Sequence, residues 1–178
     1  MCCYHCPQVS LEYLTRQICG GAVLTPQWVV TAAHCFGRVF LVSQALVRAG
    51  SGSRLVGGSV HEVRRFVKHP GFVLKVNDND IARITAPVLG ESLSHTLLNP
   101  IGFQETGDPS AYLRAVQLPV FPHDECTRIY NNTLTVTKQM LCAGYRQGGR
   151  DACILSPEIL GQRQLSVFIF SDSNYFKI

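Results

Sequence analysis

The sequence predicts an all-β protein, arranged as a sandwich or a barrel. Short runs rich in Val, Ile, Leu and Thr recur at close spacing along the 178 residues, and 15 Gly and 9 Pro supply turns between them. Only 16% of the residues are charged and 46% are hydrophobic, which is enough apolar mass for a core and excludes a charged, disordered chain. All-β barrels and sandwiches often need about 200–250 residues as one domain, so this chain is short for its class.

Charge and hydropathy exclude two classes of partner. The net charge is +4 and the basic residues are scattered rather than gathered in a stripe, so we expect no nucleic-acid partner. The apolar stretches are short and interrupted, so we expect no membrane span. We also expect a monomer. Eight cysteines are typical of an exported protein, yet the first ten residues hold no apolar signal region. We therefore expect a secreted protein whose natural start lies upstream, or an incomplete product.

The first strands follow from short apolar patterns near the N-terminus. Gln8–Tyr13 alternates in part and predicts a strand. Ile18–Leu24 predicts a second strand, in which the glycine pair Gly20-Gly21 leaves room for a neighbouring segment to approach closely. Trp28–Thr31 is a short apolar strand, and the Ala-Ala-His-Cys run at 32–35 suits one helical turn.

The middle of the chain continues the β pattern. Val39–Arg48 is apolar and β-prone, and Ser59–Lys68 alternates in the manner of a half-buried strand. Asn77–Asp80 is a turn cluster, and it leads directly into an apolar strand at Ile81–Ile84.

The last third contains fewer clear elements. Leu113–Val120 predicts a strand, and Pro122–Tyr130 predicts a short helix with proline near its start. Leu165–Phe170 is strongly apolar and uncharged. It fits either a core strand or an aggregation-prone segment.

Several blocks of sequence, in a fixed order, resemble the trypsin-like serine proteases of the chymotrypsin family (peptidase S1). They are CGGAVL at 19–24 with WVVTAAHC at 28–35, DIA at 80–82, MLCAGY at 140–145 and GGRDAC at 148–153. The resemblance covers residues 7–153 and leaves 1–6 unassigned and 154–178 as a non-homologous tail. It implies a chymotrypsin-like double Greek-key β-barrel whose second barrel is incomplete, and a chain incomplete at both ends relative to the family.

The resemblance also implies roles for three residues in proteolysis. His34 corresponds to the general base, and Asp80 to the carboxylate that orients the base. Asp151 corresponds to the floor of a specificity pocket that selects Arg or Lys in a protein or peptide substrate. The alternatives are an ordinary half-buried histidine for His34, an exposed turn aspartate for Asp80 and a surface-loop aspartate for Asp151.

Disulfide pairing follows from the same resemblance. It implies a Cys19–Cys35 disulfide that ties the histidine turn to the neighbouring strand. A Cys126–Cys142 disulfide is plausible, closing a loop around Tyr130. No cysteine follows Cys153, so that residue lacks the partner it has in the family.

The resemblance breaks immediately after Cys153. The family continues with Gln-Gly-Asp-Ser-Gly-Gly-Pro, whereas this chain continues with Ile-Leu-Ser-Pro-Glu. The nucleophile position is therefore Pro157, which has neither a hydroxyl group nor a backbone N–H. Leu155 replaces the glycine that supplies the second oxyanion donor, and Ser156 is one residue early and restricted by the following proline. We therefore expect a pseudoenzyme, catalytically inactive as written.

The N-terminal cluster of Cys2, Cys3, His5 and Cys6 raises the possibility of a zinc site. Its C-x-x-C spacing is that of a zinc ligand pair, but structural zinc sites normally bring a second pair from elsewhere in the chain. We expect no metal and no cofactor.

Three function classes remain open at this point. In the first, the chain is an altered form of a trypsin-like hydrolase. In the second, it is a non-catalytic homologue that binds protein or peptide. In the third, it is an aberrant truncated product. Family membership favours the first class. The abrupt change after Cys153 favours truncation over the binding homologue, because gradual drift leaves recognisable sequence around a substituted serine.

Overall fold

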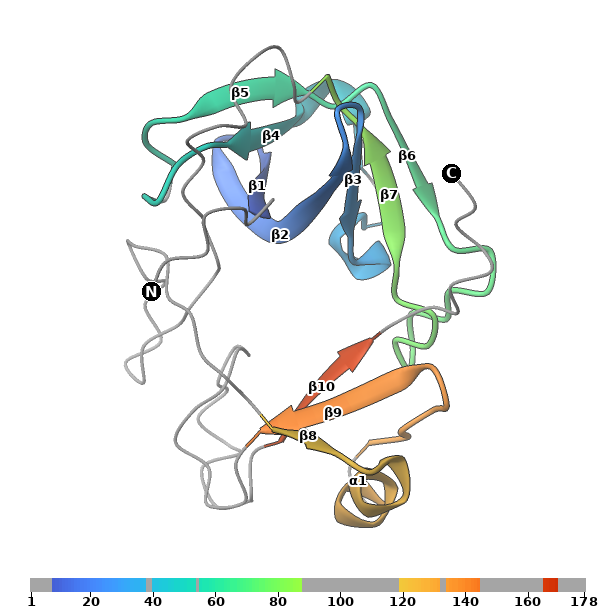
Figure 1. Ribbon diagram of the computed structural model, residues 1–178. Helices are drawn as coiled ribbons and strands as arrows, with labels where there is room; N and C mark the ends of the chain where they lie inside the picture. The colour runs from blue at the N-terminus through green and yellow to red at the C-terminus, as the bar shows by residue number, and fades with distance from the viewer. Residues whose placement is uncertain are drawn as a thin grey trace.

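A computed structural model of the chain is shown in Figure 1. It describes residues 8–37, 40–53, 55–87, 119–131 and 134–144, together with the backbone of 165–169. These residues form strands, two short 3-10 turns and one α-helix, which confirms the predicted all-β class. Among them, no helix is long and apolar enough to cross a membrane.

The elements fall into two sheets. The first holds β1 (Gln8–Tyr13), β2 (Arg16–Thr25), β3 (Trp28–Thr31), β4 (Ala45–Ala49), β5 (Ser59–Glu62), β6 (Arg65–Lys68) and β7 (Ala82–Thr85). The second holds β8 (Val120–Phe121), β9 (Met140–Gly144) and β10 (Leu165–Ile169). The helical pieces are η1 (Ala33–Cys35), η2 (Val42–Gln44) and α1 (His123–Tyr130).

The seven-stranded sheet curls round so that its two edge strands meet at one corner. Its order is β5-β4-β1-β2-β3-β7-β6, so β5 and β6 are the two edges, and only Val63 and Arg64 join them. The Val63 N–H donates to the Ala45 carbonyl in β4 at 3.1 Å, whereas the Arg64 N–H donates to the Thr85 carbonyl in β7 at 2.8 Å. Two consecutive residues thus bond to opposite ends of the sheet, and the sheet curls into the barrel seen in Figure 1.

The barrel interior is filled by aliphatic side chains from alternating strand positions. Val9 and Leu11 in β1, Val29 in β3, Val47 in β4 and Ile84 in β7 are all buried. They belong to one continuous core cluster, which removes the apolar faces of these four strands from water.

A buried ion pair joins β1 to β4. Glu12 in β1 is only 3% exposed, and its carboxylate accepts from Arg48 Nε at 2.6 Å and Nη2 at 3.3 Å. Arg48 Nη1 also donates to the Gly57 carbonyl at 2.7 Å. A buried carboxylate is tolerated when it is paired in this bidentate way, so the contact fixes β1, β4 and the turn at 57 together.

An aromatic cluster anchors the chain just after η1. Phe36 is 1% exposed and stacks on Phe66 in β6, with ring centroids 4.5 Å apart. Phe40 meets both rings edge-on and stacks on Tyr13 in β1. The η1 turn is therefore followed by a fixed hydrophobic residue rather than by a free loop.

The described part of the second unit is the three-stranded sheet β10-β9-β8 with α1 beside it. The Cys126–Cys142 disulfide joins α1 to β9, and both cysteines are buried. The backbone of β10 pairs antiparallel with β9, so the apolar run near 165–169 is a paired strand in this structure.

Some element boundaries differ from the sequence prediction. The β-prone run 39–48 forms a strand only from Ala45, because η2 turns the chain first. The run 59–68 is two strands, broken at the barrel corner. The predicted strand 113–120 lies outside the described residues except for Pro119 and Val120, and Val120 begins β8. β9 was not predicted as a strand, since MLCAG has no alternating pattern.

The glycine pair in β2 gives a stability test. A Cβ on Gly21 would lie 2.8 Å from the Val30 carbonyl oxygen and 2.9 Å from a Val29 methyl, whereas a Cβ on Gly20 meets nothing closer than 3.7 Å. We predict that Gly21→Ala lowers the free energy of unfolding by about 1–3 kcal/mol, through overpacking between β1 and β3. Gly20→Ala is the matched control, measured by the same urea titration, and equal destabilisation by both variants would contradict the close approach.

Candidate functional site

His34 lies on the η1 turn that ends β3. The N-cap residue of this turn, Ala32, has an extended backbone (φ −80°, ψ 145°) and no side chain to cap it. Asp80 performs the capping instead, because its Oδ1 accepts the backbone N–H of His34 at 2.7 Å. A carboxylate from a distant segment thus satisfies a helix-end donor, which fixes where the turn lies.

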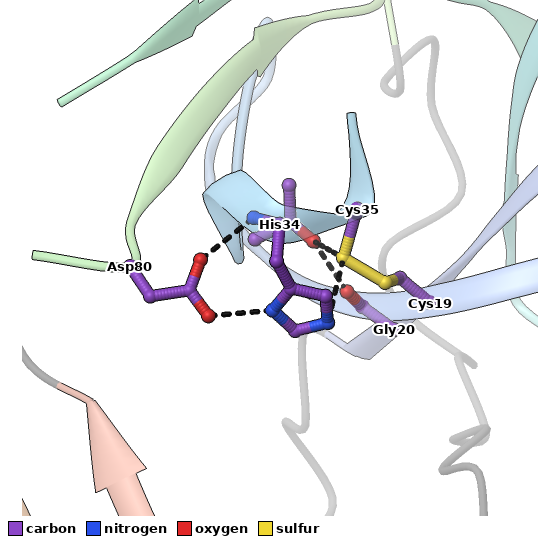
Figure 2. A network of polar contacts seen from close by, with 6 residues as sticks. Cys19, Gly20, His34, Cys35 and Asp80 are labelled. Carbon is purple, nitrogen blue, oxygen red and sulfur yellow. Dashed lines mark hydrogen bonds and ion pairs between the residues drawn. A yellow bond between two sulfur atoms is a disulfide. The ribbon is translucent and has the colours of Figure 1, made fainter. Parts of the chain in front are cut away.

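The same carboxylate holds the histidine ring. Asp80 Oδ2 lies 2.5 Å from His34 Nδ1, so the two oxygens engage the backbone and the ring of one residue, as Figure 2 shows. Strand pairing brings the residues together, because β3 pairs with β7 and Thr31 faces Ala82. Asp80 lies two residues before that pairing position and His34 three residues after it.

The environments of the two side chains differ. The side chain of Asp80 is 3% exposed, whereas that of His34 is 51% exposed. The hydrogen bond that His34 donates to Asp80 raises the pKa of His34 above its usual value; partial burial opposes this and the charge of Asp80 adds to it. With Nδ1–H directed at Asp80, the neutral ring carries its lone pair on Nε2, which lies 3.8 Å from Cys35 Sγ, a disulfide sulfur with no proton to donate. This arrangement can act as a general base.

Further contacts fix the turn that carries His34. The Cys19–Cys35 disulfide joins it to β2, as the resemblance implied, and closes a loop with a sequence separation of 16. By lowering the entropy of the unfolded chain, a cross-link over a loop of this length adds about 3 kcal/mol to the free energy of unfolding. Thr31 Oγ1 donates to the Gly20 carbonyl at 2.7 Å, and Lys68 Nζ donates to the Phe36 carbonyl. His34 is therefore held by contacts on both sides of its own turn.

The turn that presents Asp80 has an unusual backbone. Asn77 and Asn79 both adopt positive φ, 50° and 52°, which asparagine tolerates better than other side-chain-bearing residues. The Asn79 amide donates to the Gly71 carbonyl at 3.1 Å, and the Ile81 N–H donates to the Asn79 carbonyl at 2.8 Å. Asn79 was not singled out from the sequence, although the Asn-Asp-Asn-Asp repeat was a signal for such a turn.

Cys19, His34 and Cys35 place three potential metal-ligand atoms within 4.8 Å of one another. Both sulfur atoms are committed to the disulfide, and a disulfide offers no thiolate to a metal. These residues therefore do not form a metal site in this oxidised state.

Several residues proposed from the sequence lie outside the described residues. These are Asp151, Cys153, Leu155, Ser156 and Pro157 near the proposed nucleophile position, and Cys2, Cys3, His5 and Cys6 at the N-terminus. The structure thus brings His34 and Asp80 together, and the roles of the other residues stay predictions.

Comparison with known proteins identifies similar chains. The family model described as Trypsin matches residues 4–88 and 94–154. A trypsin of Simulium vittatum is 31% identical over 154 residues, covering 76% of this chain and 62% of the relative. A trypsin of Phaedon cochleariae is 32% identical over 168 residues, covering 82% of this chain and 64% of the relative. The chain thus spans less than two thirds of the length of either relative.

The two-point contact gives a prediction for the charge state of His34. Asp80→Asn removes the negative charge and the strongest acceptor for Nδ1–H, so the pKa of His34 is expected to fall. The pKa is measured by NMR titration of the ring proton, assigned with His34→Gln. Asp124→Asn, an equivalent change at an exposed helix position, is the control and is expected to leave the titration unchanged. An unshifted His34 titration in Asp80→Asn would contradict the described pairing.

The raised pKa also predicts a pH dependence of stability. A group whose pKa is higher in the folded state stabilises the fold fully below its unfolded pKa, about 6.5 for histidine, and loses that contribution as the pH rises through the folded value. The free energy of unfolding of the natural chain relative to His34→Gln is therefore expected to fall with pH above about 6.5. Denaturant titrations at a series of pH values measure it, and a difference that grows with pH would refute the sign.

Proposed function

The chain belongs to the trypsin family of serine proteases, and from that premise we propose that it retains the histidine and aspartate of the catalytic triad but lacks the serine nucleophile. The observation that carries the first part is the two-point contact of Asp80 with the backbone and ring of His34. The second part rests on the sequence, in which Pro157 stands four residues after Cys153.

The proposed role of His34 follows from its geometry. In the catalytic triad of this family, a histidine takes the proton of the attacking serine through Nε2. A carboxylate hydrogen-bonded to Nδ1–H sets the tautomer of the histidine and stabilises the imidazolium. His34 has a half-exposed ring with its Nδ1 on a buried carboxylate. We therefore assign His34 as the base and Asp80 as the orienting residue.

The proposed loss of activity follows from three neighbouring positions. Pro157 removes both the hydroxyl nucleophile and a backbone N–H that would stabilise the oxyanion. Leu155 carries a Cβ where the family has glycine, and Ser156 precedes a proline that biases it toward extended conformations. Loss of the nucleophile alone costs about 10⁶ in turnover in such enzymes. The family match ends at residue 154, where this divergent segment begins.

Substrate class and location are proposed from the same premise. Asp151, in the GGRDAC block, supports recognition of Arg or Lys in a protein or peptide, because an unpaired buried carboxylate favours a cationic partner. Eight cysteines and two disulfides support secretion into an oxidising compartment.

A non-catalytic binding role is the second candidate. The observation that favours it is a first barrel with its curled sheet, disulfide and buried ion pair in place, in a chain whose nucleophile segment has diverged in sequence. This role requires a monomeric chain that melts cooperatively. Calorimetry and light scattering test it, and aggregation without a melting transition would exclude it.

The proposal predicts no His34-dependent hydrolysis. A fluorogenic peptide amide with Arg before the scissile bond is incubated with the natural chain and with His34→Ala, and both are expected to show the same background rate. Faster hydrolysis by the natural chain than by His34→Ala would contradict the proposal. Ser156→Ala then tells whether Ser156 is the nucleophile, because only in that case would the excess rate disappear.

A further inference from the structure

The turn that presents Asp80 is in contact with the second unit. Thr137 Oγ1 donates to Asp78 Oδ1 at 2.5 Å, joining residues 59 positions apart in the sequence. Figure 1 shows the turn before β7 beside the start of β9, in agreement with this bond. The acceptor residue lies only two positions before Asp80.

The donor side of this contact is fixed. Met140 at the start of β9 donates its N–H to the Thr137 carbonyl at 3.1 Å, and the Thr137 N–H points to the Met140 sulfur at 3.5 Å. The Gln139 N–H approaches Thr137 Oγ1 at 3.4 Å. Met140 is buried and lies two residues before Cys142, which is bonded to Cys126. The Thr137 hydroxyl is therefore held by the folded second unit.

The acceptor side is held equally closely. Asp78 Oδ2 accepts from the Asn79 amide at 3.1 Å, and the Asp78 carbonyl accepts from the Val73 N–H at 3.0 Å. Asn79 is left-handed and immediately precedes Asp80. A residue with a side chain keeps a left-handed backbone only where its surroundings hold it. Because Asn79 alone separates Asp78 from Asp80, we expect a shift of Asp78 to move Asp80 as well.

We propose that Thr137 is a positioning residue for the His34–Asp80 pair, which it reaches through Asp78 and the turn at 77–80. The hydroxyl of Thr137 bonds to a carboxylate, and charge-assisted hydrogen bonds of this kind are stronger than neutral ones. The alignment of Asp80 on His34 in the first barrel thus depends on the folded state of the second unit. The assignment of this pair as a base rests on the proposed function, but the coupling itself does not.

The test uses Thr137→Val, which keeps the shape and removes the hydroxyl, in the full-length chain. The His34 pKa, measured by NMR, is expected to fall, because Asp80 no longer aligns with Nδ1. Amide exchange of the His34 N–H is expected to accelerate about threefold to tenfold, as for the loss of one typical hydrogen bond. Thr137→Ser is expected to restore both values, which a loss of methyl packing alone would not explain.

Two controls make the test decisive. Thr127→Val in α1 removes a hydroxyl that donates within its own helix, to the His123 carbonyl, and is expected to leave His34 unchanged. In an Asp78→Ala background, Thr137→Val is expected to have no further effect on either readout, because the shared bond is already absent. The proposal is overturned by an unchanged His34 in Thr137→Val, by an equal shift in Thr127→Val, or by a full additional shift in the double variant. Neither readout uses a substrate, so this result and that of the hydrolysis assay are independent.

Discussion

Asp80 holds His34 at two points, with one carboxylate oxygen on the backbone N–H and the other on ring Nδ1. The first contact replaces a missing helix cap, and the second fixes the ring and makes Nε2 the unprotonated nitrogen of the neutral form. Because one buried carboxylate makes both contacts, the position of the turn and the orientation of the ring are set together. The general-base chemistry proposed for this family member depends on that coupling.

The remainder of the first barrel serves to hold these two residues in register. Pairing of β3 with β7 brings the two segments side by side, and β2 and β6 pair with their outer sides, so neither strand is an edge of the sheet. The disulfide at Cys35 and the buried Phe36 fix the chain beyond His34. The contact between Thr137 and Asp78 extends this support to the second unit.

Local sequence signals predicted the local features well. The strands at 8–13 and 28–31, the turn at His34 and the close approach at Gly21 all followed from residues within a few positions of one another. The split of residues 59–68 at the barrel corner did not, because both halves carry the same apolar pattern and only sheet closure separates them.

Contacts between distant segments left no sequence pattern. The Asp78–Thr137 bond and the Glu12–Arg48 pair involve ordinary surface-type residues 59 and 36 positions apart, so nothing nearby marked them as partners. The pairing of His34 with Asp80 was expected only through the family resemblance. Its two-point geometry required the packed strands.

We propose that this chain carries the His34–Asp80 pair of a serine peptidase without a serine nucleophile. Intact-mass spectrometry after incubation with a fluorophosphonate, which labels activated serines, tests this directly. The natural chain is expected to show no mass increase above that of the His34→Ala variant. One covalent label per chain, lost in that variant, would show that His34 activates a serine and that a nucleophile is present.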